Sequence, residues 1–210
     1  LKTPTVSVGN MKAVITGGPS VGKTTIVNGL GQLGYRIVNE IATQIIKEGR
    51  ILPWVDRQKF QAEVLKRQQS AEASILDFDQ TVILDRGMFD GEAYYLHDKL
   101  PVPSAFSNLD SSQYDVAFLI EPLSFFEANE IRQNENLKFT KEISVILEHC
   151  YASRNVKVIR VPAMPAIERI EFVKGHVDTL KKGKATTVEQ AAHQAAYMFR
   201  GYAPVAMGSF

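Results

Sequence analysis

This chain has a single cysteine, no long apolar run and almost no net charge. Its one cysteine, Cys150, excludes an intramolecular disulfide and suits a reducing compartment, and its apolar neighbours place it in the core. No apolar run approaches the ~18 residues of a membrane span, and the first ten residues lack the apolar segment of a signal peptide. The formal net charge is +1 and the basic residues are scattered, so nucleic acid is not expected as a partner. We expect a cytoplasmic protein without a transmembrane segment.

A phosphate-binding loop is present. Residues 17–24 read G-G-P-S-V-G-K-T, which fits the Walker A pattern G-x-x-x-x-G-K-[ST], and they lie between an apolar strand pattern and an amphipathic helix pattern. The backbone N–H groups of such a P-loop cradle phosphate oxygens. Lys23 is expected to reach the β- and γ-phosphates, and the Thr24 hydroxyl to bind Mg²⁺. The pattern predicts that ATP or GTP binds with Mg²⁺ at one run of residues: Gly17, Gly18, Pro19, Ser20, Val21, Gly22, Lys23, Thr24 and Thr25.

Short apolar runs alternate with longer amphipathic stretches, and 210 residues suit one α/β domain. Strands are predicted at 12–16, 36–38, 81–84, 115–120 and 156–161, and three of these are nearly continuous apolar runs, as in strands covered on both faces. Helices are predicted at 23–33, 41–48, 56–77, 89–99, 140–152 and 165–180. The alternation predicts a parallel sheet with helices on both faces and ligands at the carboxyl ends of its strands.

Both ends of the chain differ from its middle. Residues 1–10 precede the first predicted strand and are interpreted as a leader or a cloning remnant. The run Lys-Lys-Gly-Lys at 181–184 is interpreted as a solvated linker, and Thr187 as the cap of an Ala-rich helix that extends to about Arg200. The predicted organisation is a P-loop nucleotide-binding domain over 11–180 and a linker with a C-terminal helical appendage over 181–210.

Charged residues directly follow three of the predicted strands: Glu40, then Asp85 with Arg86, then Glu121. Asp85 is expected to orient Mg²⁺ or its waters, and a simple ion pair between Asp85 and Arg86 is the alternative. Glu40 has two interpretations. It accepts a proton from a substrate hydroxyl, or it is only the acidic residue that the first turn of a helix favours.

The segment 125–138 is a candidate lid over the phosphates. It is rich in Glu, Asn and Gln and supplies only two cations, Arg132 and Lys138. Arg132 is expected to stabilise charge on the transferring phosphoryl group. A polar surface helix is the alternative for this segment.

Six sequence blocks carry a resemblance to a known family. In chain order they are I-T-G-G-P-S-V-G-K-T-T, G-Y-R-I-V-N-E-I-A, P-W-V-D-R-Q-K-F-Q, R-Q at 67–68, I-L-D-R-G and Y-D-V-A-F-L. Together they resemble the NadR-like P-loop family, small ATP- or GTP-binding proteins often labelled AAA domains. That family is similar to ribosylnicotinamide kinase and, more distantly, to deoxynucleoside and thymidylate kinases. The resemblance covers residues 12 to about 178. It implies a nucleoside-kinase-like P-loop fold with five parallel strands and a second small-molecule site beside the γ-phosphate.

The resemblance also implies residue roles. It assigns the nucleotide and Mg²⁺ to Gly17, Gly22, Lys23, Thr24 and Asp85, with Thr24 and Asp85 on the metal. It assigns the acceptor side to Glu40, Trp54, Phe60, Arg67, Gln68 and Arg86. From the residues alone, Trp54 either packs in the core or stacks on a substrate ring. The predicted catalytic set is Lys23, Glu40, Asp85, Arg86 and Arg132.

Two functions remain open. The first is a kinase that transfers the γ-phosphoryl group to a nucleoside-like metabolite. The second is a nucleotide-dependent regulatory binding module that hydrolyses slowly and engages a protein or lipid partner. The chain has neither the D-x-x-G and N-K-x-D motifs of Ras-type GTPases nor the Asp-Glu pair of mechanical AAA+ ATPases, which favours the kinase, whereas the sparse lid favours the module. Base recognition is expected at 162–165, where no motif separates ATP from GTP, and no pattern indicates an oligomeric state.

Overall fold

The computed structural model describes residues 11–75, 80–123 and 137–200, with side chains described to residue 184 and at 187. Five parallel strands form one sheet in the order β2-β3-β1-β4-β5. Their bounds are Lys12–Thr16 (β1), Arg36–Val38 (β2), Val82–Asp85 (β3), Val116–Ile120 (β4) and Val158–Val161 (β5). The three central strands are buried throughout because helices cover both faces, as their apolar runs predict.

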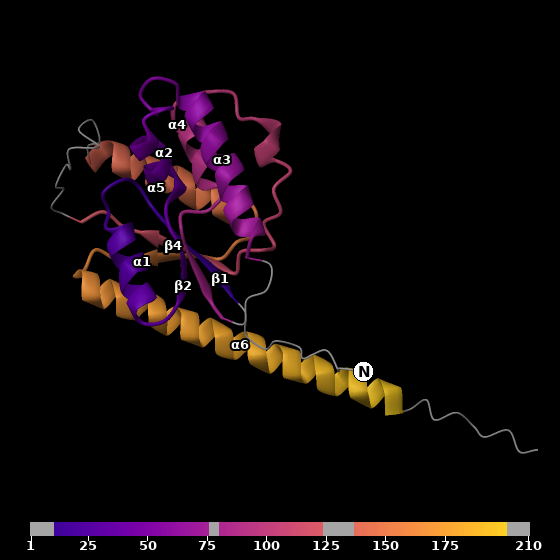
Figure 1. The fold of residues 1–210 in the computed structure, drawn as a ribbon. Coiled ribbons are helices and arrows are strands. Elements are labelled where there is room, and N and C mark those ends of the chain that lie inside the picture. Colours follow the sequence, from indigo (N-terminus) through magenta and orange to yellow (C-terminus); the bar gives the residue numbers. More distant parts are fainter. Residues whose placement is uncertain (1–10, 76–79, 124–136, 201–210) are drawn as a thin grey trace, which may run out of the picture.

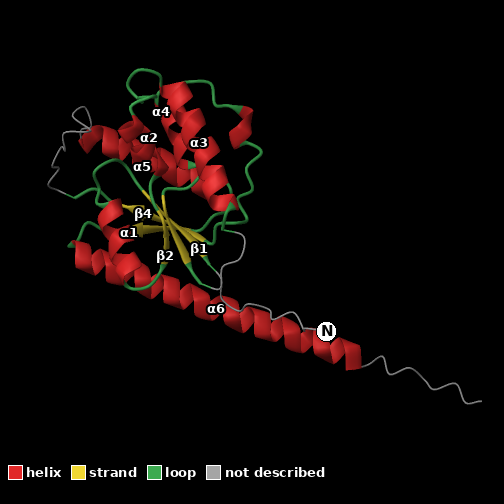
Figure 2. Ribbon diagram, viewed as in Figure 1, coloured by secondary structure: helices red, strands yellow, loops and turns green. Residues whose placement is uncertain are grey.

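Six α-helices and one 3₁₀ turn are described. They are α1 (Lys23–Gln32), α2 (Ile41–Glu48), α3 (Arg57–Ala73), α4 (Asp90–His97), η1 (Ser104–Phe106), α5 (Leu137–Ala152) and α6 (Ala166–Arg200). Figures 1 and 2 show α1 and α6 on one side of the sheet and α2 to α5 on the other. Alternate residues of β1 follow this division, because Val14 packs into the cluster with α3, α4 and α5 while Ala13 and Ile15 pack into the cluster with α1 and α6. The predicted α/β fold with five parallel strands is confirmed.

The helix predicted over 56–77 is shorter in the structure. α3 begins after its N-cap Asp56, whose side chain accepts a hydrogen bond from the Lys59 backbone N–H at 2.9 Å, and it ends at Ala73. Asp77, the predicted end of this helix, lies outside the described residues. Cys150 is buried as expected, and burial raises the pKa of its thiol to about 12.

The prediction of a linker at 181–184 is wrong, because α6 continues through these residues as one helix to Arg200. Lys and Ala are strong helix formers, and one glycine in a long helix costs only about 1 kcal/mol. Thr187 does not cap a new helix, since its hydroxyl donates to the Gly183 carbonyl one turn earlier. Figure 1 shows the C-terminal half of α6 projecting beyond the rest of the protein. The division of the chain into a P-loop domain and an appendage stays a prediction.

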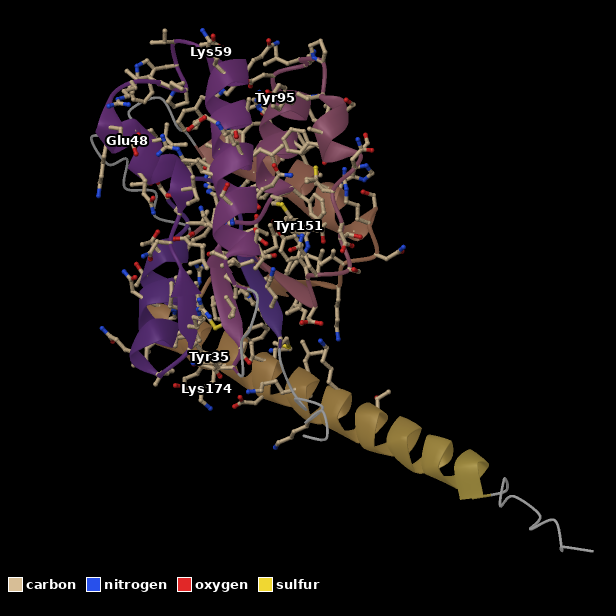
Figure 3. All side chains as sticks on the ribbon, turned by 45° about the vertical axis from the view of Figure 1, so that its right-hand side comes forward. Tyr35, Glu48, Lys59, Tyr95, Tyr151 and Lys174 are labelled. Atoms are coloured by element: carbon tan, nitrogen blue, oxygen red, sulfur yellow. The ribbon has the colours of Figure 1, made fainter. Side chains whose placement is uncertain are left out.

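α6 is attached to the domain by apolar and charged contacts. Val173 and Val177 are fully buried in the cluster under the sheet, and Leu180 packs partly against it. Asp178 accepts hydrogen bonds from Tyr35 and Lys174, which lie together in Figure 3, at 3.3 and 2.9 Å. Among the helices of the described ranges, none is long and apolar enough to cross a membrane.

A chain that ends at Thr179 is expected to fold and to bind nucleotide, because the strands, the P-loop and both buried valines are retained. It loses the partial burial of Leu180 and the ion pair of Lys184 with Asp115, so its unfolding midpoint should fall by a few degrees, the shift that about 1 kcal/mol produces. A chain that ends at Lys184 keeps both contacts and is the control. Calorimetric titration with Mg-ATP and thermal unfolding followed by circular dichroism make the comparison. Loss of folding in the shorter chain would show that the end of α6 belongs to the core.

Candidate functional site

The P-loop connects β1 to α1 and needs small residues at its start. Gly17 has φ 140°, and a Cβ atom there would lie 2.8 Å from the Ile120 carbonyl oxygen. A Cβ atom on Gly18 would lie 2.6 Å from the side chain and 2.8 Å from the carbonyl oxygen of Thr140 on α5. Since real Cβ contacts are almost never this short, only glycine allows the loop to pass between β4 and α5.

Three side chains hold this loop from within the domain. The Lys23 ammonium donates to the Gly18 carbonyl at 2.5 Å, and the Ser144 hydroxyl of α5 accepts from the Gly18 N–H at 3.3 Å. The buried guanidinium of Arg169 on α6 donates to the Val21 carbonyl at 2.8 Å and to the Glu121 carbonyl at 2.9 Å. Arg169 also donates to the Pro162 carbonyl at 3.1 Å, so the segment expected to recognise the base lies beside the P-loop.

Asp85 ends β3 with its side chain directed at the P-loop helix. Its Oδ2 accepts a hydrogen bond from the exposed Thr24 hydroxyl at 2.9 Å, whereas its Oδ1 is buried without a hydrogen-bond partner among the described residues. Burial raises the pKa of Asp85, opposed by the nearby charge of Lys23. An orphaned carboxylate oxygen beside a hydroxyl forms an oxygen donor set that fits Mg²⁺. No group of three or more His, Cys, Asp or Glu side chains elsewhere in the described ranges could hold a metal ion.

Arg86 connects Glu40 to the P-loop. Its Nε donates to Glu40 Oε1 at 2.7 Å, and its Nη1 donates to the Gly17 carbonyl at 3.2 Å. Glu40 is the N-cap residue of α2, and its Oε2 accepts from the Thr43 hydroxyl at 2.5 Å. Arg86 pairs with Glu40 and Asp90 rather than with Asp85, so the simple strand-end pair proposed for Asp85 and Arg86 is not observed. Glu40 starts a helix and also faces the P-loop network, which is compatible with both of its interpretations.

The residues predicted for the acceptor side fall into different environments. Gln68 is buried and donates to the Arg86 carbonyl at 3.2 Å and to Glu72 at 2.8 Å, so it supports the site from α3. Phe60 packs in a small cluster with Ile41 and Ile45. Trp54 is 61% exposed, so the core interpretation of this residue is wrong.

The other predicted residues lie elsewhere. Arg67 is a surface residue that binds Glu48 at 2.5 Å and Glu63 at 2.7 Å, and it does not join the network at the P-loop. Arg132 and residues 124–136 lie outside the described residues. The structure thus brings the P-loop, Glu40, Asp85, Arg86 and Gln68 together, and the roles of all these residues stay predictions.

Sequence reasoning missed three residues of this site: Asp90, Ser144 and Arg169. Asp90 begins α4, whereas Arg86 lies before this helix in a left-handed conformation, so helical spacing does not indicate their pairing. Ser144 and Arg169 lie 126 and 148 residues from their P-loop partners, and no local pattern indicates such contacts.

Comparisons with known proteins agree with this geometry. Residues 12–169 match the model of a protein family described as an AAA domain. A deoxyadenosine kinase from M. mycoides, solved with the products dCMP and a flexible dCDP, shares 17% identity at a TM-score of 0.59 over 80% of this chain and 100% of that chain. The same kinase with bound dATP gives 14% identity and a TM-score of 0.56 over 80% and 99% of the two chains.

The NadR protein in complex with NR shares 18% identity at a TM-score of 0.57. The match covers 72% of this chain but only 43% of the NadR chain. At these identities the solved structures show a shared fold. None of the curated protein sequences gives a significant match. The resemblance to NadR-like P-loop proteins is therefore confirmed at the level of family and fold.

Proposed function

The chain belongs to the AAA domain family, and we propose that it is a Mg²⁺-dependent kinase that transfers the γ-phosphoryl group of ATP or GTP to a nucleoside-like acceptor without a phosphate group. The single observation that carries this proposal is the contact of Arg86 with both Glu40 and the P-loop. It holds the Glu40 carboxylate next to the P-loop, which supports a role for Glu40 as the base that takes the proton of an acceptor hydroxyl. A module that only binds nucleotide has no need of such a group.

The donor side of the reaction uses the P-loop. Its backbone N–H groups and Lys23 bind the triphosphate, and the cation of Lys23 is already held inside the loop by the Gly18 carbonyl. Thr24 and Asp85 would hold Mg²⁺, with Asp85 Oδ1 as the oxygen that needs a partner. A Mg²⁺ ion bound there would neutralise charge on the phosphates of the nucleotide.

The charges on the acceptor side favour an acceptor without a phosphate group. Each arginine of α3 and of the turn after β3 is already paired with carboxylates: Arg57 with Asp98, Arg67 with Glu48 and Glu63, and Arg86 with Glu40 and Asp90. Bidentate recognition of a phosphate on the acceptor uses an arginine that is not already paired. These three arginines are engaged with carboxylates, whereas Arg50, in the turn after α2, has no ion pair among the described residues. The three pairs support a hydroxyl-bearing nucleoside rather than a nucleoside monophosphate.

Nucleotide consumption with a panel of acceptors tests the proposal. Mg-ATP and Mg-GTP are each incubated with nucleosides, pyridine ribosides and nucleoside monophosphates, and product formation is compared with the rate for nucleotide alone. We expect at least one riboside without a phosphate group to raise the rate and the monophosphates to leave it unchanged. Phosphorylation of monophosphates alone would overturn the acceptor class. A rate that no acceptor raises would favour the nucleotide-dependent regulatory binding module.

Trp54, the only tryptophan, supplies a direct readout of acceptor binding. It lies 61% exposed in the turn between α2 and α3, where its indole can stack on an acceptor ring. We expect its fluorescence emission to shift to shorter wavelength when an acceptor binds the nucleotide-loaded protein, because stacking removes water from the indole. Mg-nucleotide alone should produce no shift. Unchanged emission at an acceptor concentration that saturates turnover would exclude Trp54 from the acceptor site.

A further inference from the structure

Asp90 is a buried carboxylate with no role in the proposed reaction as described above. It is the first residue of α4, is 3% exposed and accepts four hydrogen bonds. Its Oδ1 accepts from Thr16 Oγ1 and from Arg86 Nη1, each at 2.9 Å. Its Oδ2 accepts from the Tyr151 hydroxyl at 2.6 Å and from the Gly87 N–H at 3.3 Å. Burial of a carboxylate costs free energy unless hydrogen bonds compensate it. The four donors to Asp90, one of them an arginine, supply this compensation and hold the carboxylate in one position.

Arg86 is the residue that Asp90 fixes. Its backbone has φ 71°, a left-handed conformation that non-glycine residues adopt only when their surroundings enforce it. The Gln68 amide holds the carbonyl of Arg86, and Asp90 holds Nη1 of its guanidinium. The same Nη1 donates to the Gly17 carbonyl, so Asp90 keeps this edge of the guanidinium against the P-loop while Nε faces Glu40.

We propose that Asp90 is a positioning residue for phosphoryl transfer, acting on Glu40 through Arg86. This inference rests on the proposed kinase function. Two carboxylates share one guanidinium, so Asp90 holds Nη1 of Arg86 away from Glu40 and fixes the position of the Glu40 carboxylate on Nε. Without the charge of Asp90, Nη1 can turn toward Glu40, and the Glu40 carboxylate is displaced from the acceptor hydroxyl.

Tyr151 on α5, labelled in Figure 3, provides a matched control. Its hydroxyl binds the other oxygen of the same carboxylate, and its side chain is fully buried. Tyr151→Phe removes a buried hydrogen bond from Asp90 but leaves the contact of Oδ1 with Arg86 in place. A purely structural role for Asp90 predicts that kcat falls together with the unfolding temperature in both variants, whereas a positioning role predicts a loss of turnover in D90N only.

The test is a double-mutant cycle on the full chain with an acceptor that the wild-type protein phosphorylates. Asp90→Asn is expected to lower kcat by about 10- to 100-fold, the cost of misplacing a reacting group by about 1 Å, with KM for nucleotide changed less than about threefold. In the E40Q background the same substitution should lower kcat less than about threefold, because the group that it positions is already absent. Y151F should lower kcat less than about threefold while lowering the unfolding temperature. Asp90→Glu keeps the charge and should retain more turnover than D90N, and it carries the cycle if D90N does not fold.

The outcomes separate the two proposals. If the wild-type chain transfers phosphate but D90N costs as much in the E40Q background as alone, or if Y151F lowers kcat as much as D90N, the positioning role is overturned and the kinase stands. If the wild-type chain phosphorylates no acceptor, the kinase proposal is overturned and this inference with it.

Discussion

Lys23→Ala is expected to abolish tight binding of Mg-ATP and Mg-GTP while the fold stays intact. Lys23 is the first residue of α1, is 5% exposed and directs its ammonium at the carbonyl of Gly18 inside the P-loop. We expect this ammonium to move to phosphate oxygens when nucleotide binds, and each charge-assisted hydrogen bond of this kind contributes about 1.5 to 3 kcal/mol. Loss of two such bonds weakens binding by about a hundredfold or more.

Isothermal titration calorimetry measures this effect. Lys157→Ala is the control, because it removes the same charge from an exposed position directly before β5, at the opposite end of the strands from the P-loop. Both variants should keep the circular dichroism spectrum of the wild-type protein. Unchanged nucleotide affinity in K23A would remove the P-loop from the proposed site.

Glu40→Gln is expected to lower acceptor-dependent turnover by about 10² to 10⁴ while nucleotide affinity stays unchanged, because a general base contributes a factor of this size. Glutamine keeps the shape of the side chain. Its amide oxygen can still accept from Arg86 Nε, and its amide nitrogen can donate to the Thr43 hydroxyl, so the α2 N-terminus stays ordered. What it loses is the ability to take a proton. The effect should therefore appear in kcat, with KM for nucleotide nearly constant.

Glu148→Gln is the matched control for this variant. Glu148 is also an arginine-paired carboxylate, but it binds Arg160 at the surface between α5 and β5. Its replacement should leave kcat within a factor of about two, since exposed ion pairs contribute only up to about 1 kcal/mol to stability. If no acceptor raises nucleotide consumption above the basal rate and E40Q leaves that rate unchanged, the kinase proposal fails and the regulatory binding module replaces it.

The sequence by itself determined the P-loop, the parallel sheet and most helix bounds. These features depend on local rules: a glycine-rich loop between a strand and a helix, runs of apolar residues for buried strands, and apolar periodicity for helices. α2 begins and ends where its pattern predicts, because Gly49 at φ 70° closes it as a left-handed C-cap. The sequence also predicted that Thr24 and Asp85 share one site, but their hydrogen bond depends on the pairing of β1 with β3, which only the structure shows.

Only the tertiary structure decided which carboxylates share Arg86. The guanidinium contacts Glu40, which is 46 residues away in the sequence, and the Gly17 carbonyl, which is 69 residues away. It forms no ion pair with its chain neighbour Asp85. Arg67 and Gln68 are adjacent in sequence, yet one forms a surface ion pair and the other supports the site, because neighbours on a helix point in different directions. The continuation of α6 through Gly183 agrees with the local helix propensity of Lys and Ala, whereas the contact of Lys184 with Asp115, which joins segments far apart in the chain, was decided by the tertiary structure. Partner choice among charged groups depends on distances through space, and a local pattern carries no information about them.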